Sequence, residues 1–212
     1  MYTLYYSPGA ASFAVHWMLI HIGAPFELVR IDLASKQQHS AQYLALNPNG
    51  HVPTMIVDGS PAAECGALLM ALSERYPEAG LSRKIDDGDR MEYLQTMFYL
   101  ANTLQPAFRN WFYPDEAAGA ENRAATQAHA RERIERAWMQ FDTRLQDGRT
   151  YLIGPRLSAA DFLGTMLMRW SRDMPCSAGK FSNVAAYIKT MWLLPSLRLV
   201  HEREGLTDWL AN

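Results

Sequence analysis

The chain has 212 residues, of which 49% are hydrophobic, and its 20 basic and 22 acidic residues leave a formal net charge of −2. This length and composition allow a sizeable core in one or two domains, and the interspersed charges give no electrostatic footprint for nucleic acid or a membrane surface. Two cysteines, Cys65 and Cys176, are too few for a disulfide framework. With no apolar run approaching about 18 residues and a strand-like start after Met1, a cytoplasmic protein is expected.

The first third of the sequence alternates short strands with a helix. Residues 3–6 predict a buried strand that ends at Ser7-Pro8-Gly9, and Ser12 is a good N-cap for a helix that ends at Gly23-Ala24-Pro25. Residues 26–32 alternate as a second strand. Strand, helix and strand in so short a segment are typical of a parallel βαβ unit.

A turn with a constrained proline follows, and we expect it to be the centre of a binding site. Asn47-Pro48-Asn49-Gly50 is a dense turn signal, and Pro53 stands at the mouth of a strand. Residues 54–63 predict a hairpin with Asp58-Gly59 as its turn. An X-Pro bond at such a bend is where a cis peptide occurs, and it would leave the Val52 N–H and C=O free to pair with an extended ligand.

Beyond the hairpin the hydrophobic pattern becomes helical. Residues 65–75 predict a helix whose free N-terminal amides favour a carboxylate. The breaker cluster at residues 76–80 predicts a linker. Long helices are then expected over residues 86–110, kinked or interrupted at Gln105-Pro106, and over 121–145.

The last part of the sequence predicts three more helices. Ser158 is expected to cap the helix that follows it, and Asp161 to reach back to the Ser158 backbone in a capping box whose role is structural. That helix continues to Trp170. Two further helices are expected over residues 179–193 and 196–203.

The order of elements predicts an α/β domain of thioredoxin-like order over residues 1–77 and an all-helical bundle domain over 85–212. The Val-Pro hairpin, followed by an acidic residue at a helix start, resembles the glutathione site of cytosolic glutathione transferases. Gly154, Ser158 and Asp161 at their spacing, followed by an apolar helix, closely resemble the C-terminal domain of that family. The resemblance extends over nearly the whole chain.

Within the family, the segment SPGAxS after a Tyr-rich strand looks most like the bacterial beta class. That class has a cysteine before the serine, where this chain has Ala11, and a His-Lys pair on the first long helix, where this chain has Gln105-Pro106. Two expected active-site features are therefore absent. A mixed disulfide at Ala11 is excluded, because alanine has no sulfur.

The resemblance implies that the protein binds glutathione and favours its thiolate. A thiol with a pKa near about 8.5 is mostly protonated at neutral pH, so its pKa must fall by roughly two units. The candidates are the Ser12 hydroxyl at the helix start, Tyr6 at the strand end, and the backbone amides of Ala10 and Ala11; Ser12 ranks above Tyr6. In the alternative, Ser12 is only a helix cap and Tyr6 only a core residue.

Further glutathione contacts carry over from the resemblance. Glu64 would pair with the γ-glutamyl ammonium group while the Cys65 N–H and the helix dipole receive the α-carboxylate. Lys36 and His51 would reach the glycine carboxylate, unless they are plain surface residues, and Cys65 is either a low-pKa thiol or a small buried residue. The implied glutathione-binding residues are Ala11, Lys36, His51, Val52, Pro53, Glu64 and Cys65.

The electrophile pocket is expected between the domains, with Asn102 as an alternative contact across a dimer interface. Its candidate residues are Asn102, Gln105, Phe108, Arg109 and Trp170. The implied function is attack of the glutathione thiolate on a hydrophobic electrophile, without a metal, by a detoxifying homodimer. Two alternatives are a glutathione-binding carrier or regulatory protein with little transferase activity, and a peroxide reductase or disulfide exchanger, which Ala11 weakens.

Overall fold

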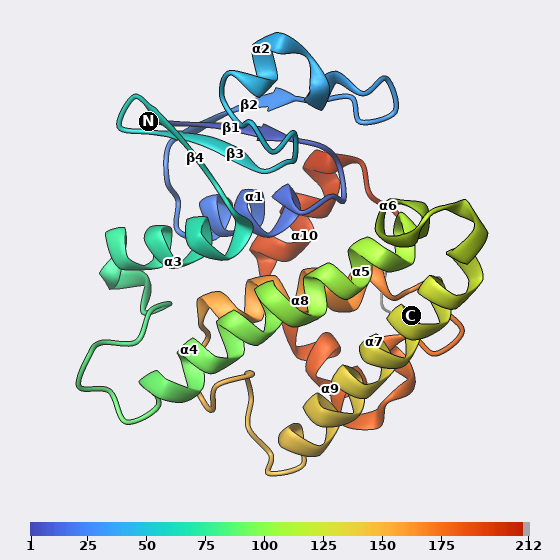
Figure 1. Cartoon of the computed structure of the whole chain (residues 1–212). Helices are drawn as coiled ribbons and strands as arrows, with labels where there is room; N and C mark the ends of the chain where they lie inside the picture. Colours follow the sequence, from blue (N-terminus) through green and yellow to red (C-terminus); the bar gives the residue numbers. More distant parts are fainter. Residues whose placement is uncertain (210–212) are drawn as a thin grey trace. The chain divides into compact units, whose positions relative to one another are not determined.

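The computed structural model of the chain, shown in Figure 1, describes residues 1–209. It divides into two compact units: Met1–Ser82 together with the segment that starts at Trp192, and Arg83–Met191. The first unit is the α/β one and the second is helical, which confirms the predicted fold class. The expected helical domain over 85–212 is divided, because its last segment packs into the first unit.

The first unit is built on a four-stranded sheet of order β2-β1-β3-β4. β1 pairs with β2 in parallel and with β3 antiparallel, and β3 pairs antiparallel with β4. Helices α1 and α3 lie on one face of the sheet and α2 on the other (Figure 1). The bounds are β1 (Tyr2–Tyr6), α1 (Ser12–His21), β2 (Phe26–Arg30), α2 (Ala41–Leu44), β3 (Thr54–Val57), β4 (Ser60–Ala63), α3 (Cys65–Arg75) and α10 (Pro195–Glu204).

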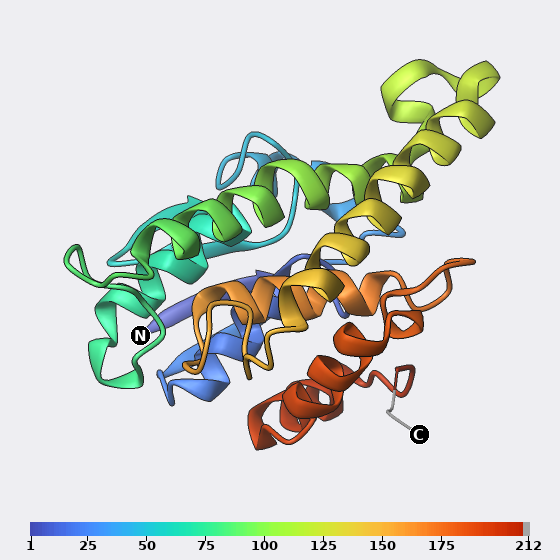
Figure 2. The same ribbon diagram turned by 90° about the horizontal axis from the view of Figure 1, so that it is seen from below.

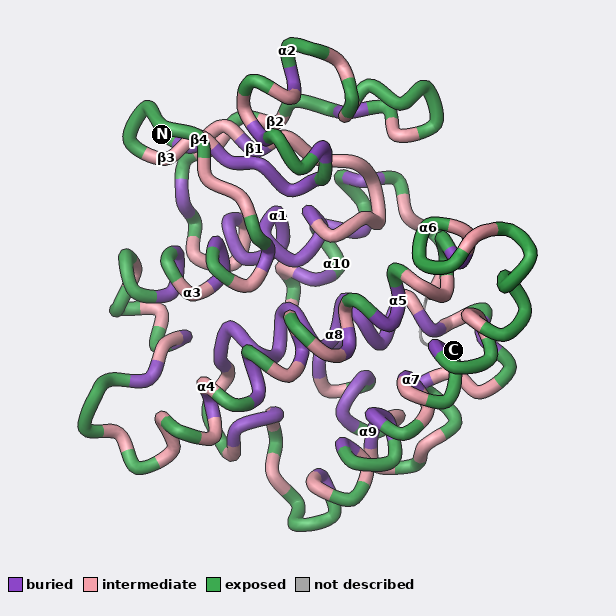
Figure 3. The backbone as a smooth tube through the Cα atoms, viewed as in Figure 1, coloured by how far each residue is buried: buried purple, intermediate pink, exposed green. Residues whose placement is uncertain are grey.

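Helix α1 is the centre of the core of this unit. All its residues from Ser12 to Leu19 are buried, including Trp17 with no exposed surface. The reason is that α1 contacts β1, α3 and α10, so that no face of its first two turns is left to solvent. The segment appears as continuous buried backbone in Figure 3.

Helix α10 belongs to the first unit because its polar side chains find partners on α1 and in the loop before it. Trp17 Nε1 donates to Ser196 Oγ at 3.0 Å, and His21 Nδ1 lies 2.9 Å from the same oxygen. Glu204, near the other end of α10, contacts His16 and Gly9. These contacts join residues more than 170 positions apart, which local sequence patterns do not report.

The second unit contains six α-helices among the described residues. Helix α7, yellow in Figure 2, is 23 residues long and packs against α5, α6 and α9. The bounds are α4 (Arg90–Tyr99), α5 (Gln105–Phe112), α6 (Pro114–Ala118), α7 (Arg123–Leu145), α8 (Ala159–Trp170) and α9 (Ser182–Met191).

The predicted interruption at Gln105-Pro106 is confirmed. A π-helical segment, Leu100–Leu104, joins α4 to α5 and ends immediately before Gln105-Pro106. Because proline has no N–H, Pro106 cannot donate to the carbonyl of Asn102, and the wider turn accommodates that loss.

Helix α8 is the core of the second unit, buried from Ala159 to Arg169. The predicted capping box is present: the Ser158 N–H and hydroxyl both donate to Asp161 Oδ2 at 2.8 Å. Leu152 N–H and the Tyr187 hydroxyl donate to Oδ1 at 2.8 and 2.9 Å. Burial raises the pKa of Asp161, against the effect of these four donors. With its acceptors occupied by the protein itself, the carboxyl group is structural, as expected.

Among the described helices, none is both long and apolar enough to span a membrane. Residues 1–209 also hold no group of three or more His, Cys, Asp or Glu side chains arranged for a metal ion. Cys65 and Cys176 are both free thiols.

Candidate functional site

The turn before β3 has the geometry that the sequence predicts. The Val52-Pro53 peptide bond is cis, and both residues are buried. Neither the N–H nor the C=O of Val52 forms a hydrogen bond with any residue that the structure describes. Both groups are therefore open to a partner that runs alongside in an extended conformation.

A buried polar network holds this turn in place. The Tyr43 hydroxyl donates to the His51 carbonyl at 2.7 Å, and Asn47 Nδ2 donates to the same carbonyl at 2.9 Å. Both groups also contact Thr54 Oγ1, at 2.9 and 3.1 Å. Because the hydroxyl proton of Tyr43 goes to His51, Thr54 donates to Tyr43 and accepts from Asn47. Burial raises the pKa of Tyr43, which keeps it a donor. The network fixes the backbone on both sides of Val52.

An apolar cluster joins this turn to the loop between β1 and α1. Its members are Ile31, Tyr43 and Val52, with Tyr5, Ala10 and Leu33 packed against them. The Tyr5 and Tyr43 rings meet edge to face at 5.9 Å. The cluster makes the Val52 turn and residues 7–11, hereafter loop 7–11, neighbours, so that two separate predicted parts of the site come together.

Ser12 does not have the local role expected from the sequence. The N-cap of α1 is Ala11, which has helical backbone angles, so the prediction of Ser12 as the cap was wrong. The Ser12 side chain is buried, its Oγ donates to the Ser7 carbonyl at 3.2 Å, and it accepts from the Ser7 N–H at 3.1 Å. The hydroxyl closes loop 7–11, and its single proton is already in use.

The backbone amides of the same loop differ in what they bind. Gly9 N–H donates to Glu204 Oε2 at 2.7 Å, and Ala10 N–H donates to the Ser7 carbonyl at 3.1 Å. The amides of Ala11 and Ser12 donate to no described residue. They are the first amides of α1, where the helix dipole is positive, so they form a small site for negative charge.

The two tyrosines at the end of β1 point to opposite faces, as strand alternation requires. The Tyr6 ring packs edge-on against His16 of α1, with ring centroids 5.7 Å apart. Tyr5, on the other face, lies in the cluster with Val52 and Ala10. Tyr6 is half-buried and remains a candidate, but Tyr5 is the residue that packs beneath the Val52 turn.

The start of α3 presents a strained acidic residue. Glu64 has φ of 70°, which is uncommon for a residue with a side chain, and strained residues of this kind cluster at functional sites. Its exposed carboxylate contacts no described residue through a hydrogen bond or ion pair. Ala63 pairs with Thr54 in the sheet, which brings Glu64 to the Val52 end of β3. The amides of Cys65 and Gly66 are likewise unpaired among the described residues.

Cys65 does not have the environment of a low-pKa thiol, which was one of its two predicted roles. Its side chain is 3% exposed, and burial, reinforced by the charge of Glu64, raises the pKa of the thiol to about 12. The thiol is therefore protonated and shielded at neutral pH. The alternative of a reactive, low-pKa cysteine is contradicted, and Cys65 is a small buried residue.

Three basic residues, Lys36, His39 and His51, belong to the segment between β2 and β3 that contains the Val52 turn. Lys36 and His51 are exposed, Lys36 in a left-handed backbone conformation with φ of 59°. His51 Nδ1 lies 2.8 Å from the Gly50 carbonyl. His39, which carries no recognisable motif, packs so closely on Gly50 that a Cβ there would lie 2.7 Å from its Nδ1.

The electrophile-pocket candidates lie in the second unit. Phe108 has no exposed surface and packs with its ring centroid 5.7 Å from that of Trp170 and 6.0 Å from that of Phe112. Arg109 pairs with Glu116 at 2.7 Å. Asn102 is exposed and Gln105 half-buried. Phe112, outside the candidate set, is 47% exposed and shares the cluster of aromatic rings.

Comparisons with known proteins agree with this architecture. Residues 1–70 match the model of the glutathione S-transferase N-terminal domain, and residues 93–195 match that of the C-terminal domain. The chain therefore belongs to the glutathione S-transferase family. Its thioredoxin-like and helical parts are the two domains of that fold.

Similar proteins extend over nearly the full chain. The chain is 28% identical over 205 residues to glutathione S-transferase GstA of Escherichia coli O157:H7, and 29% identical over 205 residues to glutathione S-transferase GST-4.5 of Xanthomonas campestris pv. campestris. Each alignment covers 96% of this chain and 98% of the relative. A solved sphingomonad glutathione S-transferase complexed with glutathione superposes with a TM-score of 0.84 at 28% identity, over 97% of this chain and 100% of that one.

Proposed function

We propose that the protein is a glutathione transferase in which the thiolate of bound glutathione attacks a hydrophobic electrophile. The observation that carries the proposal concerns the N–H and C=O of Val52, which form no hydrogen bond with any described residue. The first amides of α1 and α3, which also lack a partner within residues 1–209, flank them. Both full-length relatives are named glutathione S-transferases, and a related structure holds glutathione. These names support the same co-substrate here.

The tripeptide would bind along the Val52 edge as an added strand. Its cysteinyl N–H and C=O would pair with Val52, its γ-glutamyl ammonium with the free Glu64 carboxylate, and its α-carboxylate with the Cys65 and Gly66 amides. Lys36 and His51 would attract the glycine carboxylate, and Pro53 would shape the bend.

The thiol would lie at the start of α1. The amide of Ala11 and the helix dipole stabilise a thiolate without a side-chain donor. The Ser12 hydroxyl would have to leave Ser7 to reach the sulfur, so its contribution is to shape loop 7–11. Tyr6 follows as a second candidate. Attack forms a carbon–sulfur bond. In a substitution the electron pair of the broken bond departs with the leaving group, and in an addition the π pair of the activated double bond shifts onto its electron-withdrawing group, which then takes up a proton from solvent.

The second unit would supply the apolar side chains that bind the electrophile. Among Asn102, Gln105, Phe108, Arg109 and Trp170, Trp170 combines an aromatic ring with partial exposure, and Phe112 adds a second such ring. Phe108 would support both rings from beneath. Hydrophobic aromatic electrophiles suit such a surface.

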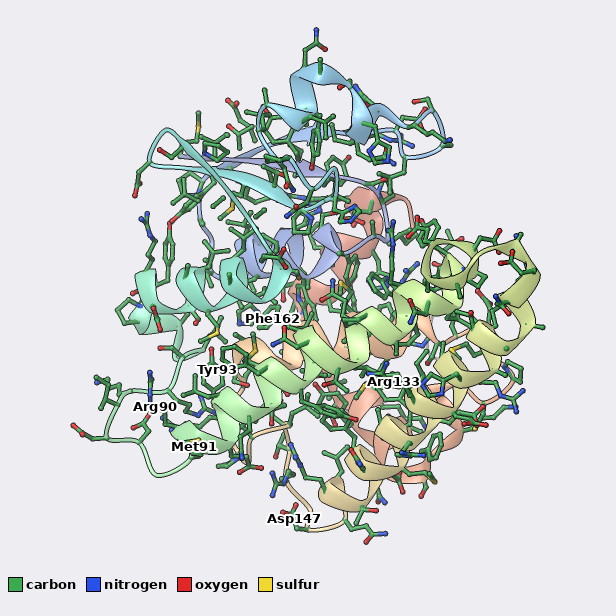
Figure 4. The ribbon with its side chains drawn as sticks, in the orientation of Figure 1. Arg90, Met91, Tyr93, Arg133, Asp147 and Phe162 are labelled. Carbon is green, nitrogen blue, oxygen red and sulfur yellow. The ribbon has the colours of Figure 1, made fainter. Side chains whose placement is uncertain are left out.

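We also propose a cytoplasmic homodimer with a role in detoxification. Met91 and Phe98 on α4 are 66% and 58% exposed, and Met139 on α7 is 53% exposed. Figure 4 labels Met91 at the start of α4. Exposed apolar side chains of this size on two helices favour burial against a second copy. A reducing compartment suits two free cysteines.

Two measurements test the function. Ultraviolet thiolate absorbance during glutathione titration at neutral pH should show that the bound thiol is ionised, and conjugation of aryl halides and unsaturated carbonyls should follow. Binding without ionisation or turnover would instead identify a glutathione carrier. Absence of glutathione binding would refute both functions.

A further inference from the structure

A buried carboxylate from α10 reaches the loop in which the thiol site is proposed. Glu204 Oε2 accepts from the Gly9 N–H at 2.7 Å, and Glu204 Oε1 lies 2.8 Å from His16 Nδ1. The side chains of both Glu204 and His16 have no exposed surface. The contacts join positions 195 and 188 residues apart in the chain.

Burying the Glu204 carboxylate and the His16 imidazole costs free energy, and these two side chains have few hydrogen-bond partners. A carboxylate acceptor assigns Nδ1 of His16 as the donor, and His16 Nε2 then meets no hydrogen-bond partner among the described residues. The ring is instead enclosed by Tyr6 at 5.7 Å and Phe26 at 5.5 Å. Buried ionisable pairs are weak sources of stability, and apolar residues of similar volume often replace them without loss. The distinctive effect of Glu204 is therefore its hold on the Gly9 amide.

Gly9 is in a position to set the direction of the amides after it. It has φ of 68°, and Ala11 follows two residues later. With Gly9 bound to Glu204 and Ala10 bound to Ser7, each amide of this part of the loop before Ala11 is fixed from one side. The Ala11 and Ser12 amides are thereby left as donors without a hydrogen-bond partner among the described residues.

We propose that Glu204 is a positioning residue for the thiol site: held by His16, it fixes Gly9 and so orients the Ala11 and Ser12 amides, which donate to no described residue. Resting on the function proposed above, the inference adds that the C-terminal helix takes part in thiolate stabilisation without contacting glutathione.

The test measures the order of loop 7–11 and the ionisation of bound glutathione, both in the full chain. Amide hydrogen exchange without ligand reports the order of loop 7–11, with α3 as internal reference, and thiolate absorbance reports ionisation of added glutathione. In Glu204→Ala, amide exchange at Gly9 and its neighbours should accelerate roughly tenfold more than amide exchange in α3 does. The fraction of bound glutathione present as thiolate should fall roughly tenfold. Both effects are of the size expected for the loss of one hydrogen bond to a charged acceptor. With an aryl halide, kcat should fall while the KM for glutathione stays within roughly twofold.

Further variants separate geometry from charge and from folding. Glu204→Gln keeps an oxygen for the Gly9 N–H and presents its NH2 group to His16 Nδ1, which accepts once the ring takes its other tautomer, so this variant should restore both readouts. Glu204→Asp keeps the charge but is one methylene too short for both contacts, so it should resemble Glu204→Ala, and it replaces that variant if alanine prevents folding. Glu202→Gln, the same change at an exposed position of α10, should alter neither readout.

If amide exchange in loop 7–11 and in α3 accelerates equally in Glu204→Ala, the inference is overturned. It is also overturned if exchange accelerates in the loop alone while the bound thiolate fraction stays at the wild-type value. If the unmodified protein binds no glutathione, the proposed function fails separately. Hydrogen exchange still decides in that case whether Glu204 anchors the loop.

Discussion

The hydroxyl of Tyr43 donates a hydrogen bond of 2.7 Å to the carbonyl of His51, the residue before Val52. Tyr43 comes from α2, so the helix on one face of the sheet holds the turn at its edge. The same hydroxyl contacts Thr54, the residue after Pro53. The edge that would bind glutathione is thus braced from both ends by a single side chain.

Tyr43→Phe should weaken this brace while keeping the ring in the apolar cluster. We expect a loss of about 1–2 kcal/mol of unfolding free energy, because the buried Thr54 hydroxyl loses its acceptor while Asn47 still serves the His51 carbonyl. Glutathione affinity should fall several-fold. Denaturant unfolding and calorimetric titration measure the two effects. Tyr5→Phe, which removes a neighbouring hydroxyl with no hydrogen bond to a described residue, is the control; equal effects of both variants would refute the brace.

Short-range patterns predicted local features in both units. Asp58 and Gly59 both have positive φ, 51° and 81°, as the hairpin signal requires. Pro53 marked the bend, and Ser158 with Asp161 marked the start of α8. In each case neighbouring residues decide the conformation, so the sequence carries the information locally.

Contacts of polar side chains that form only when the chain folds were not predictable in the same way. Serine is a residue type typical of helix caps, but Ala11 is the N-cap of α1. The Ser12 hydroxyl instead forms hydrogen bonds with the Ser7 backbone. Glu204 looks like one more charged residue of an exposed helix until α10 packs on α1. Asn47 and Tyr43 acquire their roles only when the turn folds over α2. Sequence patterns do not show which partner such a polar group will meet in the folded chain.

Ala11→Pro should reduce thiolate formation by removing one backbone donor. Ala11 has φ of −60°, which proline adopts without change, and its N–H has no described partner to lose. The bound thiolate fraction at neutral pH should fall roughly tenfold with little change in glutathione affinity. Ala11→Ser, which keeps the N–H, is the control. If the thiolate fraction is unchanged in Ala11→Pro but falls in Ser12→Ala or Tyr6→Phe, a side chain and not the Ala11 amide stabilises the thiolate.

Cys65 should make the protein less stable at alkaline pH. Burial raises the pKa of its thiol from 9.0 to about 12, so the native state retains a proton that the unfolded chain releases. Stability from this group is complete below the unfolded pKa and declines as the pH rises from about 9 toward 12. Thermal midpoints should therefore fall more steeply over that window in the wild type than in Cys65→Ala. Parallel curves would show that the thiol ionises equally in both states.

Glu64→Gln should weaken glutathione binding without affecting the fold. The Glu64 carboxylate is exposed and has no described partner, so its loss leaves no group unpaired and the thermal midpoint should stay constant. If it pairs with the γ-glutamyl ammonium, the dissociation constant should rise roughly five- to tenfold, and less at high salt. Glu74→Gln, the same change of charge at an exposed position of α3, separates a direct contact from the general field. Equal weakening by the two variants would place the ammonium group elsewhere, whereas a specific effect of Glu64 that salt suppresses would identify it as the counter-charge.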